Sequence, residues 1–245
     1  MMRRRCQRGF SLVELLATVS VVALLAGLSL PSLGRARHAA ANARCVSNLR
    51  QLGLATQLYW DEHGGRAFAE RRERHTDGWV YWFGWLQDGA EGQRAFDPTA
   101  GALWPYIQGR GVEVCPSLNR NSPLFKPKAR GVAHGYGYNL LLGPRNGTVV
   151  NLHHVAAPSS LAVLADAGQV NDFQPPASPD LPMLEEFFYF GTNGLEATIH
   201  FRHAGRSQVV FADGHVAAER PQPGSEDLRL PPHLLGRLPA ERVRP

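Results

Sequence analysis

Histidine and aspartate side chains gather near the C-terminal end of the chain, in residue types that could bind a metal ion. Imidazole and carboxylate groups are common ligands of zinc and other transition ions. The candidate ligands in this region are His200, His203, Asp213 and His215. Three residues farther away in the sequence could join them, and they are His134, His153 and Asp166. A metal site and a metal-dependent enzyme are therefore hypotheses that the sequence raises.

The same residues also have simpler structural interpretations. His203 and Asp213 could exchange a hydrogen bond that holds the segment before a hairpin, and Asp213-Gly214 is by itself a favoured turn. The sequence contains no Gly-x-Ser-x-Gly elbow, phosphate-binding loop, HExxH or Cys-His pairing that would supply an activated nucleophile. We therefore expect a structural role for these residues, and neither an enzyme nor a cofactor. A membrane-tethered metalloenzyme is a weaker hypothesis.

The chain has three cysteines, Cys6, Cys45 and Cys115, and no Cys-x-x-Cys spacing of the zinc-knuckle kind. Cys6 lies in a basic segment at the N-terminus. If that segment is removed, Cys45 and Cys115 are left as an even pair, for which a disulfide is possible in an exported chain. The sequence does not show whether their Cα atoms come close enough, so free thiols remain an alternative.

A single carboxylate, Glu14, stands near the start of a long apolar run. The stretch RGFSLVELLATVSVVALLAGLSLP covers residues 8–31, and residues 15–34 carry no charge. Such a stretch is long enough to cross a bilayer as a helix. An ordinary signal peptide or signal anchor is the alternative, but the run is long for one and lacks a clear Ala-x-Ala step. A carboxylate near a membrane interface seeks a partner, so Glu14 could set the register between neighbouring helices.

The helical pattern continues beyond the apolar run. Alanine, leucine, glutamine and arginine are frequent up to His63, and Gly64-Gly65 is a plausible stop. We expect one helix over residues 10–63, kinked at Pro31, apolar on all faces in its first half and amphipathic in its second. The predicted core-facing stripe is Val46, Leu49, Leu52, Ala55 and Leu58, widened by Leu54 and Tyr59.

The net charge of +5 is concentrated at the N-terminus. Arg3, Arg4, Arg5 and Arg8 contribute four of the 26 basic residues, which leaves 22 against 21 acidic residues in the remainder. The excess therefore acts as a positive-inside orientation signal, with the N-terminus cytoplasmic. A nucleic-acid-binding surface is not predicted.

The segment RGFSLVELL resembles the class III leader of type IV prepilins and type II secretion pseudopilins: a basic leader, glycine, phenylalanine, then glutamate at the start of an apolar helix. The resemblance implies cleavage by a prepilin peptidase between Gly9 and Phe10 and N-methylation of Phe10. It also implies that Glu14 acts in filament assembly. The implied partners are the peptidase, other pilin-like subunits, an assembly platform and the inner membrane.

The C-terminal part carries the clearest local pattern. QVVFA, then Asp213-Gly214, then HVAA predicts a hairpin with a two-residue type I′ turn, whose two central positions need φ > 0. Residues 203–214 also match the motif of a large prepilin-like family, named for His-x9-Asp-Gly, through His203, Asp213 and Gly214. The resemblance extends over nearly the whole chain, and what the motif does is not settled by it.

Two further segments bear on the domain. SSLAVLADAG reads as an apolar strand ending in Asp166. DGWVYWFGWLQDG is rich in tryptophan, at Trp79, Trp82 and Trp85, and reads as a half-buried aromatic cluster. The alternative is an exposed platform for glycan, DNA or a secreted substrate, as in a binding module of the minor-pilin type. The exposure of the three rings discriminates between the two.

Together these observations predict an α+β, pilin-like protein. We expect a cleavable leader over residues 1–9, a helix over residues 10–63 with a membrane-spanning first half, and a globular domain over residues 64–245. That domain is expected to be a mainly antiparallel sheet with long loops, in the periplasm of a single-pass inner-membrane protein. The predicted function is a structural subunit of a type II secretion pseudopilus or a type IV pilus-like filament.

Overall fold

The computed structural model describes residues 11–69, 71–107, 112, 114–130, 135–144, 149–191 and 196–245. The chain forms two compact units, Met1–Ala41 and Asn42–Pro245. The second half of the N-terminal helix therefore belongs to the same unit as the strands. The leader, Gly9 and Phe10 lie outside the described residues.

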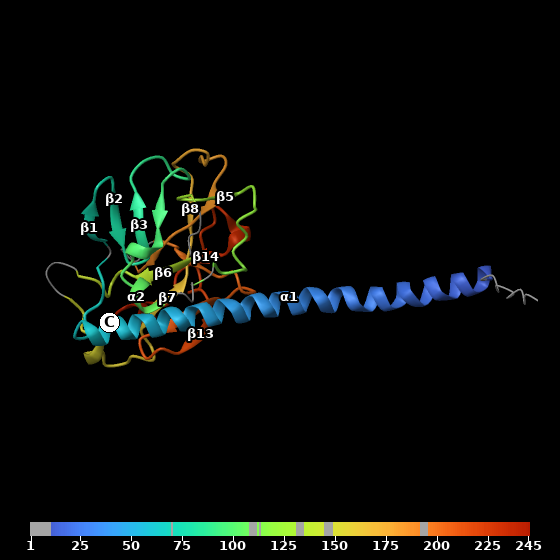
Figure 1. Cartoon of the computed structure of the whole chain (residues 1–245), viewed down its shortest axis with the longest axis horizontal. Coiled ribbons are helices and arrows are strands. Elements are labelled where there is room, and N and C mark those ends of the chain that lie inside the picture. The colour runs from blue at the N-terminus through green and yellow to red at the C-terminus, as the bar shows by residue number, and fades with distance from the viewer. Residues whose placement is uncertain are drawn as a thin grey trace, which may run out of the picture. The chain divides into compact units, whose positions relative to one another are not determined.

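Helix α1 spans Leu12–Glu62, close to the predicted range (Figure 1). Pro31 lies inside the helix without ending it. The stop follows from Gly64 and Gly65, whose φ angles are +61° and +81°. Glycine adopts this left-handed region without steric cost, which lets the N–H of Gly65 donate to the carbonyl of Trp60 at 2.7 Å.

The buried face of α1 differs in part from the predicted stripe. Leu49, Leu52 and Ala55 are buried as expected, but Leu54 and Leu58 are 61% and 50% exposed. The face is completed instead by residues that the apolar pattern left out or did not reach. These are Cys45, Asn48, Thr56 and Trp60. Polar side chains can lie on a buried face when they are bonded, and Asn48 Nδ2 donates to the Tyr136 hydroxyl at 3.1 Å.

The largest sheet has five strands in the order β10-β6-β7-β12-β13. They are β10 (Tyr189–Phe190), β6 (Tyr136–Asn139), β7 (Ala162–Asp166), β12 (Ser207–Phe211) and β13 (Val216–Glu219). All neighbouring pairs are antiparallel except β10 with β6. Strands β7 and β12 are buried along their whole length. For β7 this agrees with the apolar run before Asp166, whereas β12 begins with the polar Ser207 and Gln208, of which Gln208 is bonded to Asn42.

Smaller sheets complete the domain. A four-stranded meander consists of β1 (Arg71–His75), β2 (Gly78–Tyr81), β3 (Gly84–Gln87) and β4 (Phe96–Asp97), of which β1 to β3 lie side by side in Figure 1. A three-stranded sheet joins β5 (Phe125–Lys126), β9 (Met183–Glu185) and β8 (Gln169–Asn171). Strands β11 (Ile199–His200) and β14 (Leu235–Gly236) form a pair.

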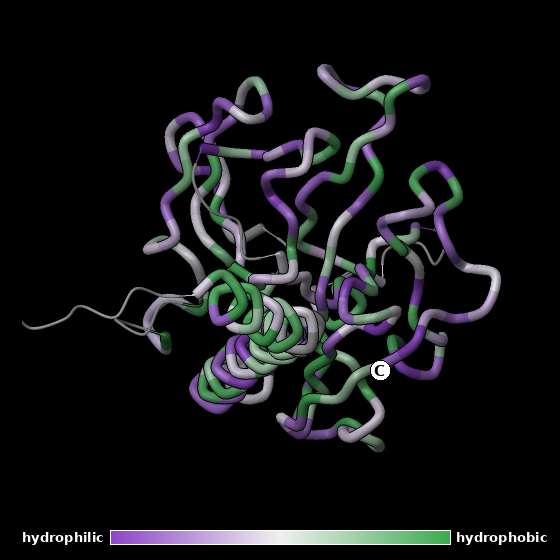
Figure 2. The backbone as a smooth tube through the Cα atoms, turned by 90° about the vertical axis from the view of Figure 1, so that its right-hand side faces the viewer, coloured by the Kyte–Doolittle hydropathy of each residue, from purple (hydrophilic) through white to green (hydrophobic). Residues whose placement is uncertain are grey.

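Short helical turns lie between or after these strands, and they are η1 (Pro98–Ala100), α2 (Trp104–Ile107), η2 (Leu152–His154), η3 (Pro231–His233) and, after the last strand, α3 (Ala240–Val243). Hydrophilic segments lie mostly in the peripheral loops in Figure 2. The predicted α+β class, with a long N-terminal helix and a mainly antiparallel sheet domain, is confirmed.

Gly53 sets how closely α1 approaches the sheet. A Cβ atom at this position would lie 2.8 Å from Val210 Cγ1 on strand β12, closer than real Cβ contacts allow. Glycine normally weakens a helix interior, so its presence here follows from the close packing rather than from helix propensity.

We expect Gly53→Leu to destabilise the domain by about 1–3 kcal/mol, because overpacking forces side chains off their rotamers or shifts the backbone. Gly34→Leu is the matched control, since a Cβ at Gly34 meets no atom within 4 Å. Denaturant unfolding of the full chain in detergent would measure both. Equal stability of the two variants would show that the approach of helix and strand is not limiting.

Candidate functional site

The first described residues of the N-terminal segment form a capping box. The N–H of Glu14 donates to Ser11 Oγ at 3.2 Å, and the N–H of Ser11 donates to Glu14 Oε2 at 2.9 Å. The Ser11 hydroxyl also donates to Oε2 at 2.9 Å. This reciprocal pairing satisfies backbone donors that a helix start leaves free. Glu14 is therefore bonded within its own chain at the start of α1.

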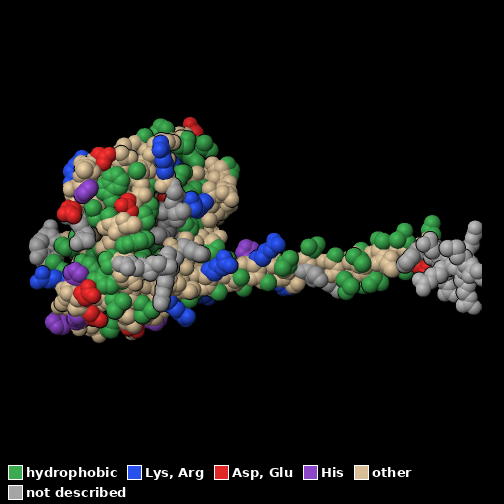
Figure 3. All heavy atoms as spheres, viewed as in Figure 1, with side chains coloured by type: hydrophobic (Ala, Val, Ile, Leu, Met, Phe, Trp, Pro, Cys, Tyr) green, Lys and Arg blue, Asp and Glu red, His purple; other side chains and the backbone are tan. Residues whose placement is uncertain are grey.

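The segment that follows is apolar on all sides. Its large apolar side chains are exposed, because little of the chain covers them. They include Leu12, Val13, Leu15, Leu16, Val19, Val21, Val22, Leu24, Leu25 and Leu30. Figure 3 shows hydrophobic side chains along this stretch and basic ones nearer the C-terminal part of the helix. Within the described part of the chain, α1 is the one helix long and apolar enough to cross a membrane by length and composition.

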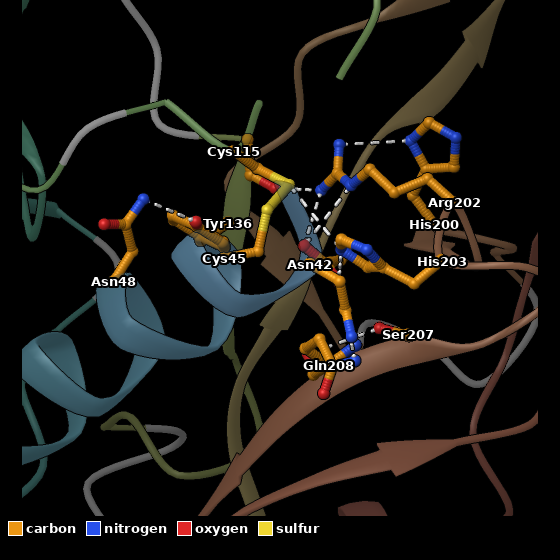
Figure 4. The surroundings of a disulfide bond; sticks show 12 residues. Asn42, Cys45, Asn48, Cys115, Tyr136, His200, Arg202, His203, Ser207 and Gln208 are labelled. Carbon is orange, nitrogen blue, oxygen red and sulfur yellow. Dashed lines mark hydrogen bonds and ion pairs between the residues drawn. A yellow bond between two sulfur atoms is a disulfide. The ribbon is translucent and has the colours of Figure 1, made fainter. Parts of the chain in front are cut away.

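The histidine of the His-x9-Asp-Gly motif lies in a buried polar cluster of the globular unit. His203 lies beside Cys115 (Figure 4), with Nε2 3.6 Å from Cys115 Sγ. The same Nε2 atom is 3.2 Å from Asp166 Oδ2. All three side chains are buried. The sequence had suggested Asp213 as the partner of His203. The structure gives that place to Asp166 at the end of β7.

Asp166 is the centre of this cluster. Its Oδ1 accepts from Arg202 Nη2 at 3.1 Å and from Arg202 Nε at 3.3 Å. Its Oδ2 accepts from the backbone N–H of Gln208 at 2.8 Å. Arg202 also donates to the carbonyl of Gly135. A buried carboxylate needs such partners, because an unpaired charge in the interior is very costly.

A disulfide joins this cluster to the helix. Cys45 of α1 and Cys115 are bonded, with a Cα–Cα distance of 5.1 Å. A further bond lies on the same side of the helix, where Gln208 Nε2 donates to Asn42 Oδ1 at 2.9 Å (Figure 4). The sequence left the pairing of the two cysteines open, and it did not place His203 beside them.

This arrangement does not form a nucleophilic relay. In a Cys-His-Asp triad one imidazole nitrogen faces the thiol and the other faces the carboxylate. Here the same atom, Nε2 of His203, faces both Cys115 Sγ and Asp166 Oδ2. The cluster is thus suited to holding elements together.

The Asp-Gly end of the motif forms a turn of a different type from the predicted one. The N–H of Gly214 donates to the Phe211 carbonyl at 2.8 Å, and the N–H of Phe211 donates to the His215 carbonyl at 3.0 Å. Of the two motif positions only Gly214 has positive φ, at +88°. The loop therefore has three residues and matches a type I turn followed by a glycine bulge. The prediction of a two-residue type I′ turn is wrong.

Asp213 and Gly214 each have a local role in this turn. Asp213 Oδ1 accepts from the N–H of His215 at 3.2 Å and pairs with His215 Nδ1 at 2.6 Å. A Cβ at Gly214 would lie 2.6 Å from Gln57 Nε2 on α1. The two ends of the motif thus meet the helix at different points, His203 beside the Cys45 disulfide and Gly214 beside Gln57.

The histidines proposed as metal ligands do not come together as a set. Asp213 pairs with His215, and His153 pairs with Asp61 on the surface at 3.1 Å. His200 bonds to Arg202 through Nδ1 at 3.2 Å, and burial followed by the nearby Arg202 charge lowers the pKa of His200 well below its ordinary value. His134 lies outside the described residues. Among the described residues the one group with metal-ligand spacing is Cys45, Cys115 and His203.

The aromatic segment is mostly part of the fold. Trp82 is 1% exposed and donates from Nε1 to the carbonyl of Phe188 at 3.1 Å. Trp79 and Trp85 are half-buried, with Arg74 over the Trp79 ring and Trp85 Nε1 bonded to the His75 carbonyl. A ligand-binding platform built from these three tryptophans would therefore contain at most two rings, Trp79 and Trp85, and both are partly covered.

A second buried charged cluster, which no sequence motif predicted, lies around Lys126. Lys126 bonds to Glu185 at 2.7 Å and to Glu91, and Lys128 lies 3.5 Å from Glu185. Burial would raise the pKa of Glu185, but the bond to Glu91 and the two lysines lower it to about 2. Oppositely charged partners thus account for this cluster without a ligand.

Comparison with known proteins matches the N-terminal part of the chain to a family. The family described as a prokaryotic N-terminal methylation motif matches residues 4–30. No curated protein matches the chain, and no solved structure does. The match supports a pilin-type or pseudopilin-type subunit, and with the apolar helix it fits a single-pass protein anchored in the inner membrane.

Proposed function

We propose that this protein is a structural subunit of a type II secretion pseudopilus or a type IV pilus-like filament. A prepilin peptidase would cleave it between Gly9 and Phe10, and Phe10 would then be N-methylated. The observation that carries the proposal is the methylation-motif match over residues 4–30, which covers the basic leader and the start of the apolar helix. The function is assembly through α1, with like subunits and an assembly platform as partners.

The exposed apolar surface of α1 supports assembly. Its side chains need lipid before assembly and neighbouring apolar helices afterwards, because leaving them in water is unfavourable. The basic residues of the leader favour a cytoplasmic N-terminus. The Cys45–Cys115 disulfide suits a domain outside the inner membrane, where disulfides persist.

Glu14 has a carboxylate oxygen to offer a neighbouring subunit. Its Oε2 accepts both bonds from Ser11, while Oε1 accepts none from the part of the chain that the structure describes. The amine of a processed Phe10 in a neighbouring subunit would supply a charged partner for Oε1. The capping box would thereby hold the carboxylate in a fixed position for that contact.

Intact-mass measurement of the protein from its native membrane tests the proposal. The expected species starts at Phe10 and carries one added methyl group. A species that starts beyond Pro31 would contradict the proposal and indicate an ordinary signal peptide. A matched control is Gly9→Leu, which should leave the leader attached if cleavage occurs at this peptide bond.

A further inference from the structure

Metal-ligand atoms converge beside the disulfide of the globular unit. The Sγ atoms of Cys45 and Cys115 and the Nε2 atom of His203 all lie within 4.8 Å of one another. Asp166 Oδ2 lies 3.2 Å from the same Nε2. Figure 4 shows the two sulfur atoms and the His203 ring directed toward one another. Two sulfurs, one imidazole and one carboxylate make a ligand set that zinc accepts.

The four side chains come from separate parts of the fold and are enclosed. Cys45 is on α1, Asp166 ends β7, His203 precedes β12, and Cys115 lies in a connecting segment. All four are buried, with both cysteines and Asp166 at 0% exposure. Structural zinc sites are closed in this way, whereas catalytic ones keep a position open for water or substrate.

We propose that the reduced form of this protein binds one Zn²⁺ ion through Cys45, Cys115, His203 and Asp166. Opening the disulfide takes two electrons and two protons from a dithiol, which is itself oxidised to a disulfide. Zn²⁺ then binds the two thiolates, neutral His203 and the Asp166 carboxylate, and the two thiol protons are released. The zinc ion and the disulfide are thus alternative cross-links between Cys45 and Cys115.

The charge of the buried cluster supports this exchange. In the oxidised form the carboxylate of Asp166 is balanced by the guanidinium of Arg202. In the zinc form two thiolates and one carboxylate are balanced by Zn²⁺ and Arg202. The charges of these groups sum to zero in both forms, so neither form leaves one of them without a counter-charge in the interior.

Groups around the ligands are already arranged for a metal. Arg202 holds Asp166 through Oδ1, and the Gln208 backbone N–H holds it through Oδ2. Such bonds orient ligating carboxylates in metal sites. Zinc would therefore hold α1 to the rest of the domain in a chain that has not yet been oxidised.

The test uses the full chain with Cys6→Ser, in detergent, so that Cys45 and Cys115 are its two cysteines. The protein is reduced anaerobically with a phosphine, incubated with Zn²⁺ and desalted. Elemental analysis should then find one equivalent of Zn²⁺ per reduced chain and none above background in the oxidised chain. Co²⁺ in place of Zn²⁺ should give a thiolate charge-transfer band.

Two histidine variants make the test specific. His203→Gln should weaken zinc binding by at least about tenfold, because even an outer-shell partner is worth that much. His154→Gln, at an exposed position of η2, should bind as the parent does. Circular dichroism reports the fold of each reduced sample. A folded reduced chain without zinc, an unfolded one that zinc does not restore, or equal binding by both variants would overturn the proposal.

Discussion

Replacing Asp166 by alanine is expected to destabilise the globular unit by about 3–5 kcal/mol, the range for breaking a buried ion pair by removing one partner. Asp166 is fully buried, accepts from Arg202 and from the Gln208 backbone, and has its Oδ2 atom 3.2 Å from Nε2 of His203. Its removal leaves the guanidinium of Arg202 without its counter-charge in the interior. It also leaves the Gln208 N–H without an acceptor near the start of the interior strand β12.

Denaturant unfolding of the oxidised full chain in detergent measures this effect. The fluorescence of Trp60 and Trp82 should report it, because both rings are buried in the core of the unit. Asp172→Ala is the matched control, since Asp172 pairs with the half-exposed Arg229 at 3.0 Å. We expect that variant to lose at most about 1 kcal/mol, as is usual for surface pairs.

The same experiment examines the role of the His-x9-Asp-Gly motif. If His203 acts by bonding to Asp166, then Asp166→Ala and the double variant Asp166→Ala/His203→Gln should have similar stabilities. If the stability lost in the double variant equals the sum of the losses in Asp166→Ala and in His203→Gln, then His203 stabilises the fold through other contacts, such as the one with the disulfide. A loss of less than about 1 kcal/mol in Asp166→Ala would show that the cluster is not central to stability.

The sequence predicted elements that depend on local patterns. The continuous apolar run before Asp166 is strand β7, and Gly64-Gly65 ends α1 as expected. The error in the helix stripe has a local cause. Spacing by threes drifts around a helix of 3.6 residues per turn, so Leu58 falls off the buried face and Trp60 falls on it.

The buried cluster could not be predicted because its contacts join distant parts of the chain. Cys115 and His203 are 88 residues apart, and Arg202 and Asp166 are 36 apart. A sequence motif relates residues that are close in the chain, and His203 was therefore expected to pair with the nearby Asp213. The turn type was missed for a smaller reason. Ala212 also belongs to the loop, and with three loop residues only the glycine needs positive φ.

Glu14→Ala is expected to reduce assembly at least tenfold, while cleavage of the leader after Gly9 continues. Under the proposed function, the Glu14 carboxylate pairs with the amine of Phe10 in a neighbouring subunit. Losing that pair leaves the amine uncompensated among apolar helices, at a cost of several kcal/mol, and 1.4 kcal/mol already corresponds to a factor of ten. Copurification of tagged and untagged copies from one cell, divided by the total mature subunit, measures assembly.

Ser11→Ala separates pairing from capping, because it removes the hydroxyl of the capping box and keeps the Glu14 carboxylate. Loss of an N-cap costs about 1 kcal/mol of helix stability, so this variant should assemble much better than Glu14→Ala. If both variants lose assembly equally, the effect of Glu14 lies in starting the helix. If Glu14→Ala is cleaved normally and assembles like the parent, the carboxylate does not pair between subunits. Glu14→Gln, which keeps the shape without the charge, should resemble Glu14→Ala if the interaction is ionic.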